Sequence, residues 1–280
     1  MYSTRVQRPD VWRIVTINIW NRQGPWERRL ALLRDGLRAL DADAIGFQEV
    51  LAFPNQGSQL DAIAEGLGWN VHYAPAWHVG GGLTFGNGIA SPHRLLDAQC
   101  LPLPTPDGLE TRSVAFARVD APHGPLPLFV THLTYQQHLA HVRLRQVRAL
   151  ADHVAALAPT DGPPAVLAGD FNAEPDSDEM RFLRGAHVLD GTSVYFADCW
   201  WATEIGAGHT YARSNEYALR AREPSRRIDY IYVRGPDRQL RGEPLATRIA
   251  LADAVDGVWP SDHFAVVADI AAAPRSLGPY

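Results

Sequence analysis

The sequence predicts an α+β fold in which two similar β-sheets pack face to face with helices outside, a four-layer α/β/β/α sandwich. Two observations lead to this prediction. A strand–helix–strand pattern occurs twice, first over residues 11–49 and again over residues 126–172. In both copies each strand runs directly into polar residues, as strands do when they end at a common rim of loops. The duplication therefore indicates two equivalent layers whose polar strand ends share one rim.

The first strand–helix–strand unit delivers two polar side chains to this rim. Residues Val11–Ile19 alternate between two apolar faces and carry Asn18 near the end of the predicted strand. Leucines recur at helical spacing from Trp26 to Leu40, and the apolar run Ala44–Phe47 then leads into Gln48 and Glu49. We therefore expect Asn18 and Glu49 at neighbouring strand ends.

The second unit repeats this plan. The strand Leu126–Val130 leads into His132, a helix is predicted over residues 136–157, and the run 165–168 leads into Gly-Asp-Phe-Asn. Asp170 and Asn172 stand two residues apart, so both side chains leave the strand end on the same face. A strand followed by an Asx turn explains such a pair equally well, so the interpretation as a site depends on the residues around it.

The segments between the two units are less regular. Ser58 is predicted to cap a helix over residues 59–67. Residues 69–94 are rich in glycine and lack the Lys-Ser/Thr ending of a phosphate-binding loop, so we interpret them as hairpin and rim structure. Three prolines predict an irregular connection over residues 102–106, followed by a strand over 113–119.

Two surface features are also predicted. The polar side of the helix over residues 136–157 carries Arg143 among other basic residues and is expected to face solvent. Trp200 and Trp201 are consecutive, so on a strand one would point into the core and the other outward. Packing at the core or rim explains this pair better than a substrate platform.

The last third of the chain contributes further polar groups. Asp229 lies inside the apolar strand 226–233, where a carboxylate is costly unless it is paired, so this residue requires a partner. Ser261, Asp262 and His263 form a loop just before the final predicted strand, residues 264–270. Asp262 could be a simple cap and His263 a structural histidine, but together they supply a carboxylate and an imidazole.

Composition restricts the class of protein. The chain has 280 residues, of which 46% are hydrophobic and 20% charged, with a net charge of -5 and a pI of about 6.1. A protein that mainly grips duplex DNA usually carries a basic excess, which this chain lacks. We expect one domain over residues 1–280, with its core at about 11–272, because large two-layer β folds reach this size as a single domain.

The compartment is also inferred from composition. The two cysteines, Cys100 and Cys199, match no metal-ligand spacing, which favours a reducing environment. Residues 1–10 are polar and hold no apolar signal-peptide core, and no segment reaches the length of a transmembrane span. We therefore expect a cytoplasmic protein. The sequence does not indicate its oligomeric state.

The polar residues at the strand ends form one chemically coherent set. They are carboxylates, carboxamides and imidazoles, and hard oxygen ligands of this kind suit Mg²⁺ or Mn²⁺ rather than a structural zinc ion. One hard cation, a carboxylate that activates water and histidines that face developing negative charge are what hydrolysis of a phosphoester requires. The set comprises Asn18, Glu49, His132, Asp170, Asn172, Asp229, Asp262 and His263.

Six short motifs follow one another along the chain: Thr-Ile-Asn-Ile-Trp-Asn (16–21), Gln-Glu (48–49), Thr-His-Leu (131–133), Gly-Asp-Phe-Asn (169–172), Arg-Ile-Asp-Tyr (227–230) and Ser-Asp-His (261–263). In this order they resemble the motifs of the endonuclease/exonuclease/phosphatase superfamily. This superfamily includes pancreatic deoxyribonuclease, apurinic endonucleases, inositol polyphosphate phosphatases and neutral sphingomyelinases. The resemblance implies the four-layer fold and Mg²⁺-dependent hydrolysis of a phosphoester, with Mn²⁺ as a substitute.

The resemblance also implies roles around the metal ion and the attacking water. By similarity, Glu49 is the principal metal ligand, helped by Asn18 and by Asp262. Asp170 resembles the residue that orients or deprotonates the water, and Asn172 the residue that holds water or phosphate beside it.

The resemblance assigns the two histidines to the phosphate. His263 would bind the scissile phosphate with Asp229 as its partner, an arrangement that favours the charged imidazole. His132 would contact the phosphate from the other side or assist the leaving group. Nucleases of the superfamily often place an acidic partner for this second histidine in the loop-rich region. Residues 84–87 offer none, which leaves the role of His132 open.

Three functions remain after this comparison. The leading hypothesis is a phosphodiesterase for a small-molecule or lipid-headgroup substrate, because the chain is acidic and residues 208–230 resemble sphingomyelinase-like members. The second is a metal-dependent nuclease acting on DNA or RNA, which is weakened because no segment interleaves basic and aromatic residues. The third is a binding module that kept the fold and lost the chemistry. The complete set of ionisable residues argues against the third.

Overall fold

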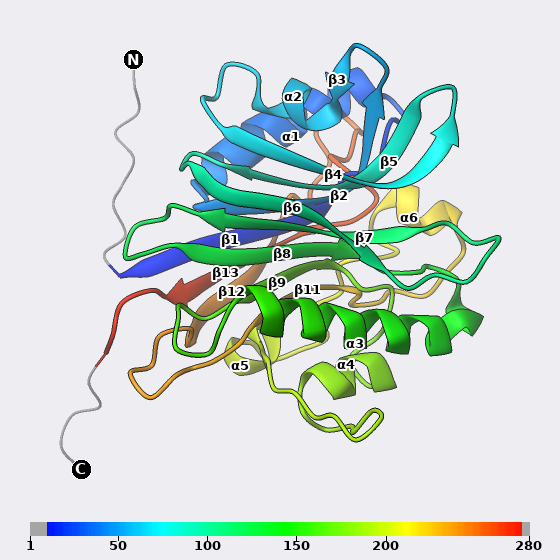
Figure 1. Cartoon of the computed structure of the whole chain (residues 1–280). Coiled ribbons are helices and arrows are strands. Elements are labelled where there is room, and N and C mark those ends of the chain that lie inside the picture. Colours follow the sequence, from blue (N-terminus) through cyan, green and yellow to red (C-terminus); the bar gives the residue numbers. More distant parts are fainter. Residues whose placement is uncertain (1–9, 276–280) are drawn as a thin grey trace.

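The computed structural model of the chain describes residues 10–275, in which two β-sheets lie face to face between two layers of helices (Figure 1). The predicted four-layer α/β/β/α sandwich is confirmed. Within residues 10–275 no helix is long and apolar enough to cross a membrane. The expectation for the N-terminal segment concerns residues 1–10, all of which except Asp10 lie outside the described residues.

The first sheet is covered on its outer face by α1 (Trp26–Leu40) and α2 (Gln59–Ala64), at the top of Figure 1. Its two central strands, β1 and β2, are parallel and are connected through α1. The strand order is β12 (Pro244–Ala250), β13 (Ala265–Ala271), β1 (Val11–Asn18), β2 (Ala44–Phe53), β5 (Leu83–Ser91) and β4 (Asn70–Gly80), and β3 (Gly57–Ser58) also pairs with β2.

The second sheet is covered by α3 (Ala140–Leu157) and α4 (Asp178–Leu183), at the bottom of Figure 1. Its parallel pair is β8 and β9, connected through the short helix η1 (Gln137–Leu139) and α3, so the predicted duplication is present. The strand order is β10 (Ala197–Asp198), β11 (Asp229–Val233), β9 (Val166–Asp170), β8 (Leu126–His132), β7 (Arg112–Val119) and β6 (Leu95–Leu103). Two more short helices, α5 (Cys199–Thr203) and α6 (Glu216–Arg220), lie in the connections.

Strand alternation determines which side chains face the space between the sheets. Successive residues of a strand point to opposite faces, so Ile14 of β1 and Val130 of β8 lie in the central core while Ile17 and Phe129 pack under the helices. Gly46 of β2 faces Val130, and a Cβ atom at this glycine would lie 2.7 Å from the valine Cγ2 atom. The absence of a side chain at Gly46 therefore allows β2 to pack closely against β8 at this point.

The connections between the two units hold more strand than the sequence predicted. Residues 69–94 do form a hairpin, but most of it is regular strand, β4 and β5. Gly86 lies within β5, where a Cβ atom would meet the Ala74 carbonyl oxygen at 2.1 Å. This position is therefore a glycine because the two strands pack closely, not because the chain forms a loop. The predicted irregular connection at 102–106 begins inside β6, an edge strand that tolerates Pro102. The sequence analysis also missed β12.

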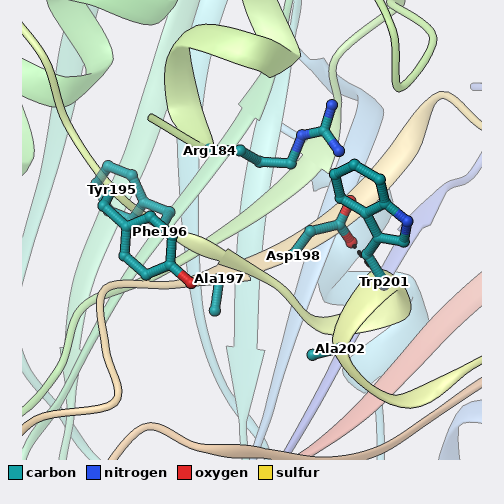
Figure 2. Close-up of a pocket in the computed structure, with 7 residues that line it drawn as sticks. All are labelled: Arg184, Tyr195, Phe196, Ala197, Asp198, Trp201 and Ala202. Atoms are coloured by element: carbon teal, nitrogen blue, oxygen red, sulfur yellow. Dashed lines mark hydrogen bonds between the residues drawn. The ribbon is translucent and has the colours of Figure 1, made fainter. Parts of the chain in front are cut away.

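Two predictions about surface side chains were wrong. Trp200 and Trp201 lie on the short helix α5 rather than on a strand, because the Asp198 side chain accepts hydrogen bonds from both of their backbone N–H groups and caps the helix. Trp201 is 64% exposed and stacks on the Arg184 guanidinium, 3.7 Å from its ring centre, at one side of a cavity of about 270 Å³ (Figure 2). Arg143 is buried rather than solvated and pairs with Glu179 at 2.8 Å.

Candidate active site

Three side chains of the second sheet form a row at one end of the central core. His132, Asp170 and Asp229 each occupy an inward-facing position at an end of β8, β9 or β11, and the strand register pairs His132 with Asp170 and Asp170 with Asp229. All three are buried. Gly169 makes this row possible, since its φ is +144° and a Cβ atom there would lie 2.0 Å from the Thr131 carbonyl oxygen.

Glu49 reaches the same place because β2 is irregular. The pairing of β2 with β5 shifts register between Phe47 and Val50, and Glu49 has a φ of +59°. Regular alternation would place this glutamate on the outer face with Phe47, whereas the bulge turns it into the cavity described below. A strained backbone at a non-glycine residue is typical of a site that the surrounding structure holds in place.

Two amides hold the Glu49 carboxylate. The Asn18 side-chain N–H₂ group lies 3.2 Å from Glu49 Oε1 and 3.1 Å from Asp170 Oδ2, and Asn21 donates to Glu49 Oε2 at 2.9 Å. Asn18 accepts the backbone N–H of Trp20 through its side-chain oxygen and is 1% exposed, so it lies behind the two carboxylates. Its contacts therefore position Glu49 and Asp170.

Arg29 of α1 fixes the loop that carries Asn21. Its guanidinium is fully buried and donates to the backbone carbonyl oxygens of Ile19, Trp20, Asn21 and Gln23. Burial lowers the pKa of Arg29 to about 10. This arginine lies on the buried face of α1 together with Leu33 and Leu37. The helix was predicted from its leucines alone, so a buried charge on this face was not expected.

His263 is the charged histidine of the site. Its Nδ1 atom lies 2.9 Å from Asp229 Oδ2, and its Nε2 atom faces Asp170 Oδ2 at 3.8 Å. Burial lowers the pKa of His263, but the negative charges of Asp229 and then Asp262 have the larger combined effect. The pKa of His263 is therefore raised well above its ordinary value. Tyr211 covers this histidine with ring centres 5.0 Å apart. His263 is therefore a cation that presents its Nε2–H group toward Asp170.

His132 lies on the other side of Asp170 and is neutral. Its Nε2 atom is 3.6 Å from Asp170 Oδ2, and its Nδ1 atom is 3.4 Å from an Arg112 Nη1 atom. Burial, followed by the charge of Arg112, lowers the pKa of His132 well below its ordinary value. A guanidinium can only donate, so Nδ1 is the accepting nitrogen and the ring proton sits on Nε2. Thus the group that contacts His132 Nδ1 is a cation, Arg112.

These groups surround one cavity of about 330 Å³ at the rim between the sheets. Asn18 and Asp229 lie just behind its wall, each 1% exposed. The site residues predicted from the sequence did not include Asn21, Phe85, Glu110, Arg112 or Tyr211. The lining residues are Asn21, Glu49, Phe85, Glu110, Arg112, His132, Tyr135, Asp170, Asn172, Tyr211, Glu223, Arg226, Ile228, Asp262 and His263.

The donor set fits a hard divalent cation. Burial, followed by the charge of Asp229, raises the pKa of Asp170 to about 7, and burial with the charge of Glu49 raises the pKa of Asp262 to about 6. These shifts reflect buried carboxylates without enough positive charge around them. The Asp229 Oδ1 atom is buried with no hydrogen-bond partner among the described residues. Asp170, Asp229 and His263 have potential ligand atoms within 4.8 Å of one another, although His263 could ligate a metal only as a neutral imidazole.

The sequence as a whole matches a family model described as the endonuclease/exonuclease/phosphatase family, over residues 15–263. The chain belongs to this family. The resemblance of the six short motifs is thereby confirmed. Endonucleases, exonucleases and phosphatases all hydrolyse phosphoesters, so the family is one of phosphoester hydrolases. Among curated proteins, none matches the chain significantly.

Solved structures of the family have the same fold. A functionally unknown conserved protein from Enterococcus faecalis V583 is 22% identical with a TM-score of 0.71, over 92% of this chain and 99% of that one. A family protein from Bacteroides vulgatus is 18% identical with a TM-score of 0.70, over 93% and 98%. D. rerio TDP2, complexed with a single-strand DNA product, is 19% identical with a TM-score of 0.70, over 93% and 98%.

The raised pKa of Asp170 makes the stability of the metal-free protein depend on pH. The folded protein holds this proton up to about pH 7, whereas the unfolded chain releases it near pH 4, so stability falls as pH rises between these values. In chelator, wild type should lose roughly 2–4 kcal/mol more unfolding free energy between pH 4.5 and 7.5 than Asp170→Asn does. Urea unfolding at both pH values measures this. If wild type and Asp170→Asn show the same pH dependence of unfolding, the pKa of Asp170 is not raised.

Proposed function

We propose that the chain is a divalent-metal-dependent phosphodiesterase that acts on a small-molecule or lipid-headgroup diester. The observation that carries the proposal is the position of Asp170 between two histidines in different protonation states. His132 lies 3.6 Å from its Oδ2 atom on one side and His263 lies 3.8 Å on the other. A carboxylate flanked by a neutral and a charged imidazole suits a reaction in which water loses a proton while negative charge develops on phosphate.

Asp170 would act on the attacking water. The backbone N–H of Asn172 donates to Oδ1 at 2.9 Å and orients the carboxylate, which leaves Oδ2 directed toward the two histidines. As the water oxygen forms its bond to phosphorus, a water proton passes to Oδ2. The bond between phosphorus and the leaving oxygen breaks, that oxygen takes up a proton from solvent, and Asp170 then releases its proton to solvent. The raised pKa of Asp170 in the metal-free protein matches the range useful to a general base.

The other polar groups would bind the phosphate. The Nε2–H of His263 would donate to a phosphate oxygen and add positive charge, and the Nε2–H of neutral His132 would donate from the other side. The Asn172 side-chain amide donates to the Leu133 carbonyl oxygen, and the Asn172 backbone has a φ of +51°. The hydrogen bond holds the turn after β9 in place. Asp229 would act through His263.

Glu49 and Asp262 are the residues we propose to hold Mg²⁺, with Mn²⁺ as a substitute. Both line the cavity, and Mg²⁺ in proteins is commonly bound through one or two carboxylates with water and substrate phosphate. Asn18 would support the pair by its hydrogen bond to Glu49. When bound, the cation would neutralise phosphate charge and polarise its oxygens. Roles assigned by resemblance to all eight predicted residues thus remain part of this proposal.

A nuclease is the second candidate function. It is favoured by one observation, that the structurally similar D. rerio TDP2 was solved with a single-strand DNA product. The net charge of -5 argues for the small diester, because phosphate contacts along a strand require unpaired basic groups. The cysteines Cys100 and Cys199 are both free, which supports a cytoplasmic location as part of this proposal.

A panel of substrates tests the proposal. Purified protein in Mg²⁺, Mn²⁺ or chelator is given bis(p-nitrophenyl) phosphate, p-nitrophenyl phosphate, a sphingomyelin-type lipid and supercoiled plasmid. We expect chelator-sensitive hydrolysis of a small or lipid diester and little nicking of plasmid. Efficient nicking that weakens steeply with salt would establish the nuclease instead. No metal-dependent activity on any substrate would overturn both functions.

A further inference from the structure

The two walls of the active-site cavity repeat one arrangement around Asp170. On one side His132 is flanked by the Phe85 ring, with ring centres 6.1 Å apart, and the Arg112 guanidinium lies 6.0 Å from the same ring centre. Arg112 in turn pairs with Glu110 at 2.9 Å. This wall therefore consists of a histidine, an aromatic ring and an Arg–Glu pair.

The opposite wall has the same four kinds of group. His263 is flanked by the Tyr211 ring at 5.0 Å, and the Arg226 guanidinium lies 5.8 Å from the centre of that ring. Arg226 pairs with Glu223. All of these side chains line the one cavity. The glutamates are the more exposed members of their pairs, at 26% and 37% against 2% and 11% for the arginines.

Because both walls carry the same kinds of group, they restrict which phosphate esters the cavity can bind. A phosphate held between the two histidines has an ester arm available for each wall, and each arm would meet an aromatic ring and an Arg–Glu pair. The charge of each arginine is matched by its glutamate, and the more exposed glutamate is the member of each pair that an added phosphate would meet first. A glutamate carboxylate repels an added phosphate and accepts hydrogen bonds from hydroxyl groups.

We propose that the site selects phosphodiesters over monoesters, and that Glu110 and Glu223 exclude diesters whose arms carry a further phosphate. This inference rests on the proposed function and deepens it, since it describes the substrate as a diester with two uncharged arms. It also gives a reason why a polyanionic strand would be a poor substrate. Specificity of this kind is achieved by a repulsive element as much as by favourable contacts.

A pair of chromogenic substrates tests the exclusion. Thymidine 5′-(p-nitrophenyl phosphate) and its 3′-phosphorylated form share the same scissile bond and differ only in one remote phosphate. In each, water adds to phosphorus and p-nitrophenolate leaves. We expect kcat/KM in wild type to be roughly tenfold lower for the phosphorylated form, and Glu110→Gln or Glu223→Gln to reduce that ratio severalfold, the larger effect marking the wall that the nucleoside arm meets.

Controls separate the possible failures. Glu204→Gln removes the same charge from an exposed position after α5 and should leave the ratio unchanged. Bis(p-nitrophenyl) phosphate and p-nitrophenyl phosphate, assayed in parallel, report the preference for diesters. If bis(p-nitrophenyl) phosphate is cleaved but the two thymidine substrates react equally in all variants, the exclusion is refuted. If no substrate is cleaved in Mg²⁺ or Mn²⁺, the proposed function itself fails.

Discussion

Asp170→Asn is expected to reduce kcat for the best diester substrate by roughly a thousandfold or more, with little change in substrate affinity. Asparagine keeps the shape of the side chain and, through its one oxygen, the hydrogen bond from the Asn172 backbone N–H, but it loses the one from Asn18, and its amide cannot accept the proton of the attacking water. Steady-state kinetics in saturating Mg²⁺ provide the measurement.

Two comparisons make the Asp170→Asn result specific. Asp152→Asn removes an exposed carboxylate from α3 and should retain wild-type rates. Calorimetric titration with Mg²⁺ should show that the Asp170→Asn variant still binds the cation, because Glu49 and Asp262 are unchanged. Full activity in this variant would refute the role of Asp170 as the base, whereas loss of Mg²⁺ binding would reassign it as a metal ligand.

The sequence predicted most of the strands that build this site, because buried strands between helices leave a strong pattern. The faces assigned to Val11–Ile19 are those observed, since Ile14 packs between the sheets and Ile17 packs under α1. The strand pattern also placed Asn18, His132 and Asp170 at or next to strand ends, where the structure has them, whereas Asp229 was expected inside a strand and begins β11. The requirement that buried Asp229 have a partner was met by His263 at 2.9 Å.

Edge strands and close contacts were harder to foresee. The prolines of 102–106 masked β6, whose exposed positions alternate but whose composition resembles a loop. A glycine can mark either a turn or a close contact within a strand, and sequence alone does not distinguish the two. Gly86, which packs against Ala74, is of the second kind. The helix α5 was missed although Asp198 stands at the capping position before Cys199, a signal that was available.

The missed site residues illustrate a second limit. Arg112 enters a buried strand as Asp229 does, and the same argument about a costly buried charge could have singled it out. Its contact with His132 depends on how β7 and β8 pair, which no local pattern reveals. Glu49 reaches the cavity only through a bulge in β2, and Arg29 supports the loop that carries Asn21 from a helix face that otherwise is apolar.

His263→Ala is expected to lower kcat/KM by roughly a thousandfold, because it removes the one imidazolium that faces the scissile phosphate. Asp229→Asn should cost about tenfold to a hundredfold, since Asp229 acts only through His263 by orienting the ring and keeping it charged. If Asp229 acts only by positioning His263, it should have no effect of its own in the double variant. Once His263 is absent, the loss of Asp229 should matter little.

A double-mutant cycle tests this dependence. The His263→Ala/Asp229→Asn protein should be about as active as His263→Ala alone, a strongly non-additive result that two independent contributions would not give. Circular dichroism and thermal unfolding of all four proteins check that the row of strands beneath the site is intact. Additive losses would mean that Asp229 contacts the substrate or the cation directly, a role for which its unpartnered Oδ1 atom is the candidate group.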